Sequence, residues 1–523
     1  MHRVLLINPP SPEQLGSPLL GQQYVAAALL ERGCEVRVID AAARYFDRDH
    51  DWIVAQAAAF EPDMIGFGLF TRWVWHAYRL TRVFGGRARS GPRVAARIGR
   101  SMRHPLLVAG GAHTTVRPDE VLEHGFDVAV IGEAERTVVE LVDHLEGRKR
   151  LEEVRGIRFR ASDGTIRDGP PALSVPDLDA LAMPLTAQHL FEPEWYDPSG
   201  AEVIPGGVLT SRGCPARCTF CANYVTGRGF RFRSADRVID ELNAYHERFG
   251  ASFFPFWDDA LTAHMPRLHE LCDALAERIG FPLRWSAITR ATMVRPQLLR
   301  AMKRAGLVAV NFGVESGDDE ILRAIRKGIT TDRVVRALEW SKQAGLYTAC
   351  NFMLGFPQES PAALERTLAF MRRIAPLVDS FSTLGVVVPF PGTPLYDENH
   401  ERYGFTDWWL REECSRYSAP PPIDDFDRFY RHYIDDANLE LDFFEYSPDM
   451  RALIRECLTF KAEHNLARMG LLKDPVFRSG PTELFGGALT AKRATARLEP
   501  DSVQPRPACE REVARGESPA ART

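Results

Sequence analysis

The chain has 523 residues, which is too long for one ordinary domain and predicts two or three. Hydrophobic residues make up 45% and charged residues 26%, and the net charge of −5 gives no basic excess that would indicate a nucleic-acid partner. No apolar run reaches the roughly 18 residues that a membrane helix needs, and the scattered cysteines outside one cluster argue against a disulfide framework and favour a reducing cytoplasm.

The first part of the chain alternates short apolar runs with helical patterns. The apolar start stops at Asn8-Pro9-Pro10, so it predicts a strand rather than a signal peptide. Continuous Val, Ile and Leu strands separated by helices predict a parallel sheet that is covered on both faces. We therefore expect an α/β, doubly wound domain over 1–147, Rossmann-like and of the flavodoxin type, with its ligand beyond the carboxyl ends of the strands. The expected strands are 3–8, 35–40, 63–69, 105–111 and 127–132, and the expected helices are 22–33, 51–60, 73–84, 118–124 and 134–146.

Residues 148–200 change character and are expected to form a linker. A hairpin that turns at Asp163-Gly164 is followed by the Pro-rich stretch "PPALSVPDLDALAMP". A second alternation then fills 201–400 and predicts a partial (β/α)6 barrel of the TIM type, although periodicity alone does not exclude a second open sheet. The expected strands are 206–211, 252–257, 283–288, 308–314, 347–354 and 383–388, and the expected helices are 235–249, 265–279, 296–305, 331–344 and 361–375.

The end of the chain divides into two parts. Residues 401–475 are rich in aromatic and charged side chains and are expected to be mostly helical and to cap the mouth of the barrel. Trp408, Trp409, Tyr417 and Tyr430 could line a substrate pocket, although buried packing explains them as well; Tyr224, Trp73 and Trp75 carry the same two interpretations. Residues 476–523 have little apolar content, which is typical of disorder.

Three cysteines lie within the stretch "SRGCPARCTFCANY", directly after the first expected strand of the barrel. Cys214, Cys218 and Cys221 have the spacing C-x3-C-x2-C, and thiolates are ligands suited to zinc or iron–sulfur clusters. A structural zinc site normally has four ligands, and no second cysteine pair is present. Three thiolates on a four-iron cluster would leave one iron open to another ligand. Three structural cysteines, or a zinc site closed by a distant histidine, are the alternative.

Further motifs follow in order, and with them the chain resembles the radical S-adenosylmethionine (SAM) superfamily over about residues 200–400. They are "FFPFWDDALT" (253–262), "RWSAITR" (284–290), "VNFGVESGDDEIL" (310–322), "NFMLGFPQES" (351–360) and "PFPGTPLYD" (389–397). The resemblance implies that the three cysteines hold a [4Fe–4S] cluster whose open iron binds SAM. One electron then cleaves the sulfonium and yields a 5′-deoxyadenosyl radical.

The resemblance also implies which side chains contact SAM. Phe220 is expected near the adenine, Arg290 beside a carboxylate, and Asp258 in the barrel mouth, where a carboxylate could accept from the methionine amine or the ribose. Its neighbour Asp259 could instead cap the next helix. Glu315 and Ser316 are the expected ribose or methionine contacts, and Gly355 and Pro357 would let the backbone approach the adenine.

The first domain resembles the cobalamin-binding domain that precedes many radical SAM enzymes. The segment "GFGLFT" (66–71) lacks the third glycine of a dinucleotide fingerprint, whereas "VLLINPP", "AGGAHTTVRPDE" and "DVAVIGEAERTVVEL" carry the resemblance. No D-x-H-x-x-G motif supplies a lower ligand for cobalt, so His113 is expected to contact the tail or a neighbouring residue. A scaffold domain without cofactor is the alternative. The expected cobalamin contacts are Asn8, Pro9, Gly110, Gly111, His113, Thr114, Gly132 and Glu133.

Together the two resemblances imply a cobalamin-dependent radical SAM methyltransferase. The adenosyl radical would remove a hydrogen atom from a small-molecule or natural-product intermediate, and methylcobalamin would then deliver a methyl group to an unactivated carbon, or to phosphorus. The alternative within the same class is a non-methylating oxidative cyclisation or rearrangement. A flavodoxin or ferredoxin is expected as the external electron donor. A tRNA methylthiotransferase would carry further cysteines in the first domain, which has only Cys34, and a non-enzymatic sensor would bind cofactor without cleaving SAM.

Overall fold

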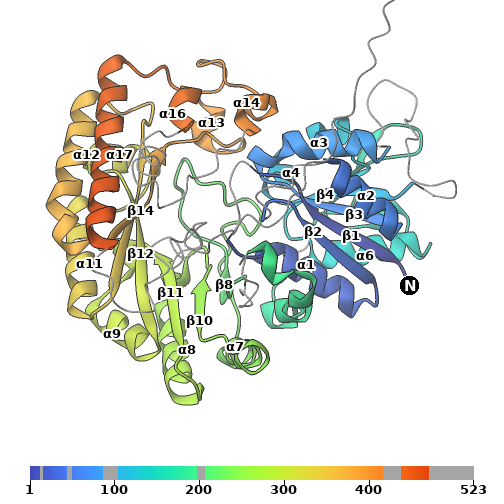
Figure 1. Cartoon of the computed structure of the whole chain (residues 1–523), viewed down its shortest axis with the longest axis horizontal. Coiled ribbons are helices and arrows are strands. Elements are labelled where there is room, and N and C mark those ends of the chain that lie inside the picture. Colours follow the sequence, from blue (N-terminus) through green and yellow to red (C-terminus); the bar gives the residue numbers. More distant parts are fainter. Residues whose placement is uncertain are drawn as a thin grey trace, which may run out of the picture.

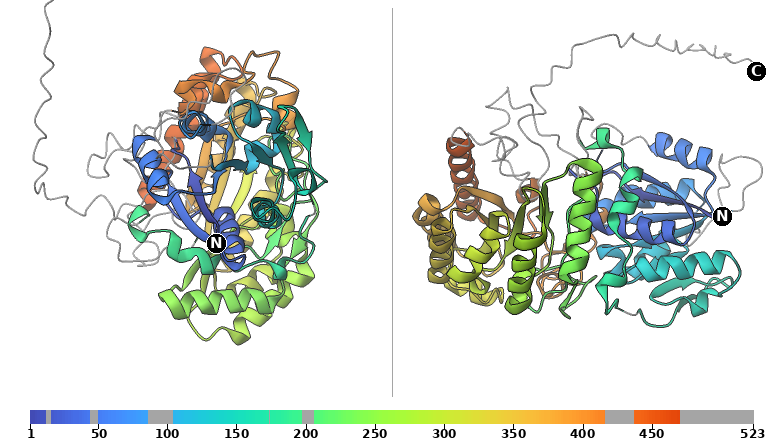
Figure 2. Two further views of the ribbon diagram at one scale, coloured as in Figure 1. Left: turned by 90° about the vertical axis from the view of Figure 1, so that its right-hand side faces the viewer. Right: turned by 90° about the horizontal axis from the view of Figure 1, so that it is seen from below.

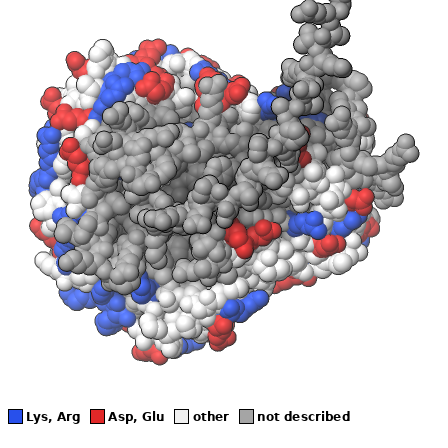
Figure 3. All heavy atoms as spheres, in the orientation of Figure 1, with Lys and Arg blue, Asp and Glu red and all other residues white. Residues whose placement is uncertain are grey.

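Two α/β units lie side by side in the computed structural model, which describes residues 1–11, 16–43, 50–85, 104–172, 174–196, 206–415 and 437–469. Figure 1 shows the first unit on the right and the second on the left, and the right-hand view of Figure 2 shows the same division from below. Where Figure 3 shows described residues, around the edge of this face, acidic and basic side chains are interspersed, in keeping with the small net charge of −5. Tyr417, Tyr430 and the expected tail at 476–523 lie outside the described residues.

The first unit is a seven-stranded sheet in the order β2-β1-β3-β4-β5-β6-β7. Strands β1 to β5 are parallel, and their order is that of the flavodoxin type, with a switch point between β1 and β3. All five strands lie where the sequence predicted them. They are β1 (Arg3–Asn8), β2 (Glu35–Asp40), β3 (Met64–Gly68), β4 (Leu106–Gly110) and β5 (Val128–Val130).

Helices cover both faces of this sheet, because its strands are apolar on both sides. Figure 1 shows α1 and α6 below the sheet and α3 above it, and α1 packs on α6 while α2 packs on α3. The helices are α1 (Leu20–Glu31), α2 (His50–Phe60), α3 (Val74–Val83), α4 (Ala112–Val116), α5 (Pro118–Glu123) and α6 (Glu135–Leu145), of which only α4 was not expected.

The expected linker is folded onto this first unit. Its hairpin, β6 (Ile157–Arg160) and β7 (Ile166–Asp168), turns where the sequence predicted and extends the sheet antiparallel to β5. Downstream, Phe191 and Tyr196 are buried against the first unit, and the Tyr196 hydroxyl donates to Asp40 at 2.6 Å. Because these aromatic side chains pack into the core of the first unit, the unit continues past residue 147 to at least residue 196. Its 3₁₀ turns are η1 (Thr71–Trp73), η2 (Leu151–Glu153), η3 (Leu178–Ala180), η4 (Pro184–Leu190) and η5 (Pro193–Trp195).

The second unit is a parallel sheet in the order β10-β11-β12-β13-β14. The first expected barrel strand joins it through a single parallel bridge between Val208 and Phe256, which gives the six positions of a partial (β/α)6 barrel. After that bridge the chain turns aside into a short antiparallel pair, β8 (Ser211–Arg212) and β9 (Arg231–Phe232). The sheet strands are β10 (Phe253–Phe256), β11 (Arg284–Thr289), β12 (Leu307–Glu315), β13 (Tyr347–Leu354) and β14 (Ser380–Val386).

Amphipathic helices cover the outside of this partial barrel, and all but α10 (Asp319–Ala324), which was not expected, lie within a residue or two of the predicted positions. They are α7 (Ala235–Phe249), α8 (Met265–Arg278), α9 (Pro296–Arg304), α10 (Asp319–Ala324), α11 (Thr331–Gln343) and α12 (Pro361–Ile374), with η6 (Leu261–Ala263), η7 (Ala291–Met293) and η8 (Ala375–Leu377). The C-terminal segment is mostly helical where it is described, and α17 packs along α12 and β14. It contains η9 (Trp408–Leu410), α14 (Glu412–Ser415), α16 (Ala437–Leu441) and α17 (Pro448–Met469), and α13 (Pro394–Asp397) directly precedes it. Of the helices in the described ranges, none is both long and apolar enough to cross a membrane.

Candidate active site

The three cysteines lie on one loop between β8 and β9. The loop is closed at its base, where the Cys214 amide donates to the Gly227 carbonyl at 3.1 Å. Gly213 has φ +91°, and a Cβ there would lie 2.2 Å from the Gly229 carbonyl oxygen, so only glycine fits. The Asp259 carboxylate accepts from the Gly213 amide at 2.9 Å and from the Thr226 hydroxyl at 2.6 Å, which ties both ends of the loop to β10.

The three thiols fit a [4Fe–4S] cluster in number and in proximity. Desolvation raises the pKa of Cys221, and thiolate charge on Cys218 and Cys214 raises it further, because the three sulfurs lie near one another. In the described part of the chain, no three His, Cys, Asp or Glu side chains converge as they would around a single metal ion. A cluster does not require this, because its thiolates bind different irons.

Two cations stand beside the cysteine loop. Nη1 of Arg290, at the end of β11, donates to the Cys218 sulfur at 3.3 Å. Among the residues described, no carboxylate of the protein pairs with Arg290, and its expected role as a SAM contact beside a carboxylate stays a prediction. Lys327 lies 5.7 Å from the ring centroid of Phe220, and its charge lowers the pKa of Cys221 against the larger effect of desolvation. Positive charge here suits a cluster with anionic ligands.

Glu315 occupies a strained position at the carboxyl end of β12. Its φ is +74°, which costs on the order of 1–3 kcal/mol for a residue with a side chain and is typical of functional sites. Its carboxylate accepts from Lys327 at 2.6 Å, and both side chains are less than a tenth exposed. Gly313 leaves room for the pair, since a Cβ there would lie 2.7 Å from the Glu315 carboxylate. No local sequence pattern marks Lys327; only its pairing with Glu315 identifies it.

Three other expected SAM contacts are engaged by the protein itself. Asp258 is buried and accepts from the hydroxyls of Thr210 and Ser211, so it anchors the entry to β8. Burial raises the pKa of Asp258, while Arg267 and these hydroxyls lower it.

Ser316 is fully buried, where its hydroxyl bonds to Thr367 at 3.1 Å and accepts from the Asp318 amide. Gly355 has φ +81°, and its carbonyl accepts from the Tyr446 hydroxyl at 2.7 Å. The close approach that glycine allows here is therefore made by a tyrosine of the C-terminal segment.

The alternative role of Asp259 as a helix cap is wrong, because His264 caps α8.

The cobalamin-type edge of the first unit contains two unsatisfied polar atoms. Asn8 at the end of β1 and Thr114 in α4 are both fully buried, and the Asn8 side-chain oxygen and the Thr114 hydroxyl have no hydrogen-bond partner among the described residues. A buried hydroxyl or amide without a partner costs about 1–3 kcal/mol. The side-chain amides of a corrinoid could satisfy both atoms, so this edge fits the group.

Some of the other expected cobalamin contacts lie at the carboxyl edge of the first sheet, and the rest lie where the two units meet. Gly110 ends β4 and Pro9 is buried just beyond β1, both at the carboxyl edge. Gly111, at φ +106°, packs on the Leu69 backbone, where a Cβ would lie 2.8 Å from the Leu69 oxygen. His113 is buried, with ring nitrogens 3.2 Å from Glu120 and 3.3 Å from Thr71, which leaves no free nitrogen for cobalt.

Gly132 and Glu133 lie where the two units meet. A Cβ on Gly132 would lie 3.8 Å from the carbonyl oxygen of Val225, inside the cysteine loop. The Glu133 carboxylate pairs with Arg212 at 3.1 Å and with Arg231 at 2.8 Å. Glu133 is therefore an interdomain ion-pair residue, and its expected role as a cobalamin contact stays a prediction. The ion pair was hidden from the sequence because its partners lie far along the chain.

Most of the aromatic candidates pack inside the protein. Trp73, Trp408 and Trp409 are less than a tenth exposed, and the Trp409 indole donates to Glu120 of the first unit at 3.0 Å. The Tyr224 hydroxyl donates to the Pro391 carbonyl at 2.6 Å, while Trp75 is half-buried beside Arg79. These contacts favour the packing interpretation and join the C-terminal segment to the first unit.

Comparison with known proteins agrees with both halves of this geometry. Residues 208–371 match the Radical SAM superfamily, which implies a [4Fe–4S] cluster and SAM, and residues 16–142 match the B12 binding domain, which implies cobalamin. An uncharacterized methyltransferase of Pyrococcus horikoshii is 29% identical over 76% of this chain and 82% of its own length.

Two further proteins are similar over most of the chain. An anaerobic magnesium-protoporphyrin IX monomethyl ester cyclase of Cereibacter sphaeroides is 26% identical over 76% of this chain and 62% of its own. The solved structure of the cobalamin-dependent SAM radical enzyme OxsB covers 78% of this chain and 56% of its own with a TM-score of 0.59 and 18% identity, a likeness of fold alone.

Proposed function

The chain is a radical SAM enzyme with a B12-binding domain, and from this premise we propose that it transfers a methyl group to a carbon, or to phosphorus, of a small-molecule substrate. One observation carries the proposal. The cysteine loop and the carboxyl edge of the first sheet meet directly, with the Val225 carbonyl opposite Gly132 and Arg212 bonded to Glu133. Two cofactor sites that share a boundary suit a reaction that needs both cofactors at one substrate.

In this proposal the protein supplies ligands and charge on the SAM side. Cys214, Cys218 and Cys221 would hold the cluster, and Arg290 and Lys327 would balance its negative charge. Glu315 would accept hydrogen bonds from an amine or hydroxyl of SAM. When bound, the cluster with SAM supplies a hydrogen-abstracting carbon radical, and cobalamin supplies a transferable methyl group.

Two aromatic side chains would position the adenine. Phe220 lies 5.8 Å from the ring of Phe356, next to Gly355, so the two rings form an apolar wall beside the cysteine loop. Tyr446 would keep this wall in place, because its hydroxyl bonds to the Gly355 carbonyl. The C-terminal segment that carries Tyr446 would also exclude water from the mouth of the barrel.

On the cobalamin side, Asn8 and Thr114 would bind the corrinoid through their unsatisfied oxygen atoms, with Gly110 and Pro9 beside them. No histidine of this edge would bind cobalt, since both nitrogens of His113 are engaged. An external flavodoxin or ferredoxin would supply the electron. A reducing cytoplasm suits this chemistry and the free thiols found among the described cysteines.

A second candidate function has a specific observation in its favour. The relative from Cereibacter sphaeroides, similar over 76% of this chain, is an anaerobic magnesium-protoporphyrin IX monomethyl ester cyclase. The same two cofactor sites could therefore serve an oxidative cyclisation or rearrangement, in which the substrate loses hydrogen and gains no carbon.

One experiment distinguishes the two candidates. The protein, reconstituted anaerobically with iron, sulfide and cobalamin, is incubated with a reductant, a metabolite extract and SAM that is deuterated in its methyl group. Methyl transfer predicts a deuterium-labelled product together with 5′-deoxyadenosine and S-adenosylhomocysteine, whereas cyclisation predicts 5′-deoxyadenosine and an unlabelled product that has lost hydrogen. Cys218→Ala should abolish the formation of 5′-deoxyadenosine and of the substrate-derived product. Cys272→Ala, at a buried cysteine in α8, should abolish neither of these.

A further inference from the structure

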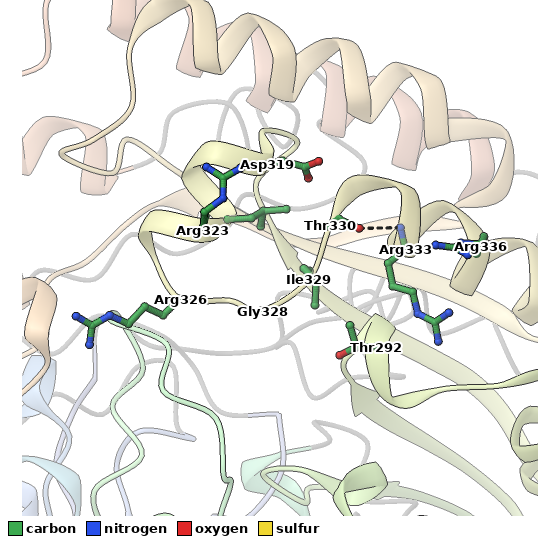
Figure 4. Close-up of a pocket in the computed structure, with 10 residues that line it drawn as sticks. Thr292, Asp319, Arg323, Arg326, Gly328, Ile329, Thr330, Arg333 and Arg336 are labelled. Carbon is green, nitrogen blue, oxygen red and sulfur yellow. Dashed lines mark hydrogen bonds between the residues drawn. The ribbon is translucent and has the colours of Figure 1, made fainter.

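An arginine-lined hollow lies on the outer surface of the barrel, next to the cysteine loop. It surrounds the turn of Gly328 and Thr330, between α10 and the start of α11. Figure 4 shows Arg323 and Arg326 on one side of this turn and Arg333 and Arg336 on the other. The remaining lining residues are Thr292, Asp319, Leu322 and Ile329.

Three of the four guanidinium groups have no hydrogen-bond or ion-pair partner among the described residues, and the fourth bonds to neutral backbone carbonyls. Arg323, Arg326 and Arg336 are exposed, and within the described ranges no carboxylate pairs with them. Arg333 is fixed, because it donates to the carbonyls of Ala291 and Val294. The acid of the lining, Asp319, is engaged by the Thr331 amide at 2.8 Å. The hollow is therefore strongly cationic on a protein whose net charge is −5.

The hollow is also close to the cluster ligands. Its backbone at Gly328 lies against Arg290, since a Cβ there would be 3.4 Å from Nη2, and Nη1 of the same Arg290 contacts the Cys218 sulfur at 3.3 Å. A second link runs from the Ile325 carbonyl, which accepts from the Thr219 amide at 3.0 Å. One side chain thus separates the floor of the hollow from a cluster ligand.

We propose that the surface formed by Arg323, Arg326, Arg333 and Arg336, here named the arginine surface, docks an acidic electron-transfer protein that reduces the cluster. This rests on the proposed function, which needs one electron from outside for each SAM cleaved. The electron leaves the reduced donor, which is oxidised by one electron, and enters the oxidised cluster; no proton or group moves. An acidic redox protein fits because complementary charge speeds encounter and orients the partner, while a short path serves the transfer.

The test measures donor binding and cluster reduction separately from turnover. Binding of a reduced acidic flavodoxin, and of an acidic ferredoxin as a second probe, is measured by titration calorimetry at low and high salt. Cluster reduction is followed by stopped-flow absorbance. The variant is R323Q/R326Q/R336Q, and the control is R278Q/R304Q/R372Q, which removes the same charge from exposed arginines that already pair with acids elsewhere.

We expect the surface variant to weaken donor binding and slow cluster reduction by about tenfold or more. The control should change neither quantity by more than about twofold. Added salt should weaken donor binding to the unmodified protein. Reduction by dithionite, a small reagent, should be equal in all three proteins. Equal donor binding in variant and control, no salt-dependent binding of either donor to the unmodified protein, or saturation of the surface by inorganic phosphate alone would overturn the docking site. Absence of SAM cleavage with dithionite would instead contradict the proposed function. The docking site would then be judged by donor binding alone.

Discussion

Nη1 of Arg212 lies 3.1 Å from Oε1 of Glu133, so the strand that leads into the cysteine loop is bonded directly to the first unit. Both side chains are at most 6% exposed, and Arg212 also donates to Glu135 at 2.6 Å. Burial alone would lower the pKa of Arg212, but the charge of Glu135 and its hydrogen bond raise it above its usual value. Arg212 is therefore charged and compensated, and it couples the position of one cofactor site to the other.

Replacing Arg212 by methionine should destabilise the protein strongly. Loss of one partner from a buried ion pair leaves a charge without compensation, here on Glu135, and costs about 3–5 kcal/mol. The free energy of unfolding, measured by denaturant titration, should fall by about 3 kcal/mol or more. Arg304→Met breaks an exposed pair with Asp273 and should cost about 1 kcal/mol or less. Equal losses in the two variants would contradict the interdomain role of Arg212.

Arg290→Met should make a reconstituted cluster harder to reduce. The guanidinium donates to the Cys218 sulfur, and hydrogen bonds and positive charge near a cluster favour its reduced, more negative state. The reduction potential, measured by a potentiometric titration followed by electron paramagnetic resonance, should fall by an amount on the order of tens of millivolts. Arg295→Met, which removes a guanidinium bonded to backbone carbonyls of η7 and its C-cap, is the matched control. An unchanged reduction potential in Arg290→Met would show that this arginine does not interact with the cluster.

Glu359 should make stability fall as pH rises from about 5 to 8. Burial raises the pKa of Glu359 to about 8, although its Oε2 accepts from the amides of Gly355 and Phe356. Because the folded-state pKa lies above the unfolded value, the folded state binds more protons in this window, so stability is largest below the unfolded pKa and is lost up to the folded one. Glu359→Gln keeps the acceptor oxygen and should flatten this loss, which we expect to be about 3 to 4 kcal/mol. Thermal unfolding at several pH values measures it, and an unchanged slope in the variant would refute the assignment.

Thr114→Val should weaken cobalamin binding without weakening the cofactor-free protein. The Thr114 hydroxyl has no described partner, so a methyl group in its place removes an unsatisfied polar atom and should leave stability unchanged or raise it by about 1 kcal/mol. Affinity for hydroxocobalamin, measured by absorbance titration, should fall about threefold to tenfold, as expected for one lost hydrogen bond.

Thr81→Val is the contrasting control. The Thr81 hydroxyl is satisfied by the carbonyls of Tyr78 and His124, so its loss should lower stability and leave cobalamin affinity unchanged. Unchanged cobalamin affinity in Thr114→Val would show that Thr114 does not contact the cofactor.

The sequence predicted the regular elements closely and the long-range pairings poorly. Helix α7 begins and ends at the predicted residues 235 and 249, because an apolar stripe, the Ser234 cap and Gly250 mark it locally. The two arginine partners of Glu133 are distant in sequence, so no local pattern could connect them. Lys327 likewise reads as an ordinary surface lysine until the strained Glu315 is seen beside it.

The hairpin β6–β7 also decides how the first sheet ends. Without it, β5 would present an open edge of buried apolar residues, to which a second copy of the chain could add a strand. Instead the outermost strand is β7, which is three residues long and carries the exposed charges Arg167 and Asp168. A short, charged edge is a poor template for strand addition. The hairpin therefore protects this edge of the sheet from strand addition.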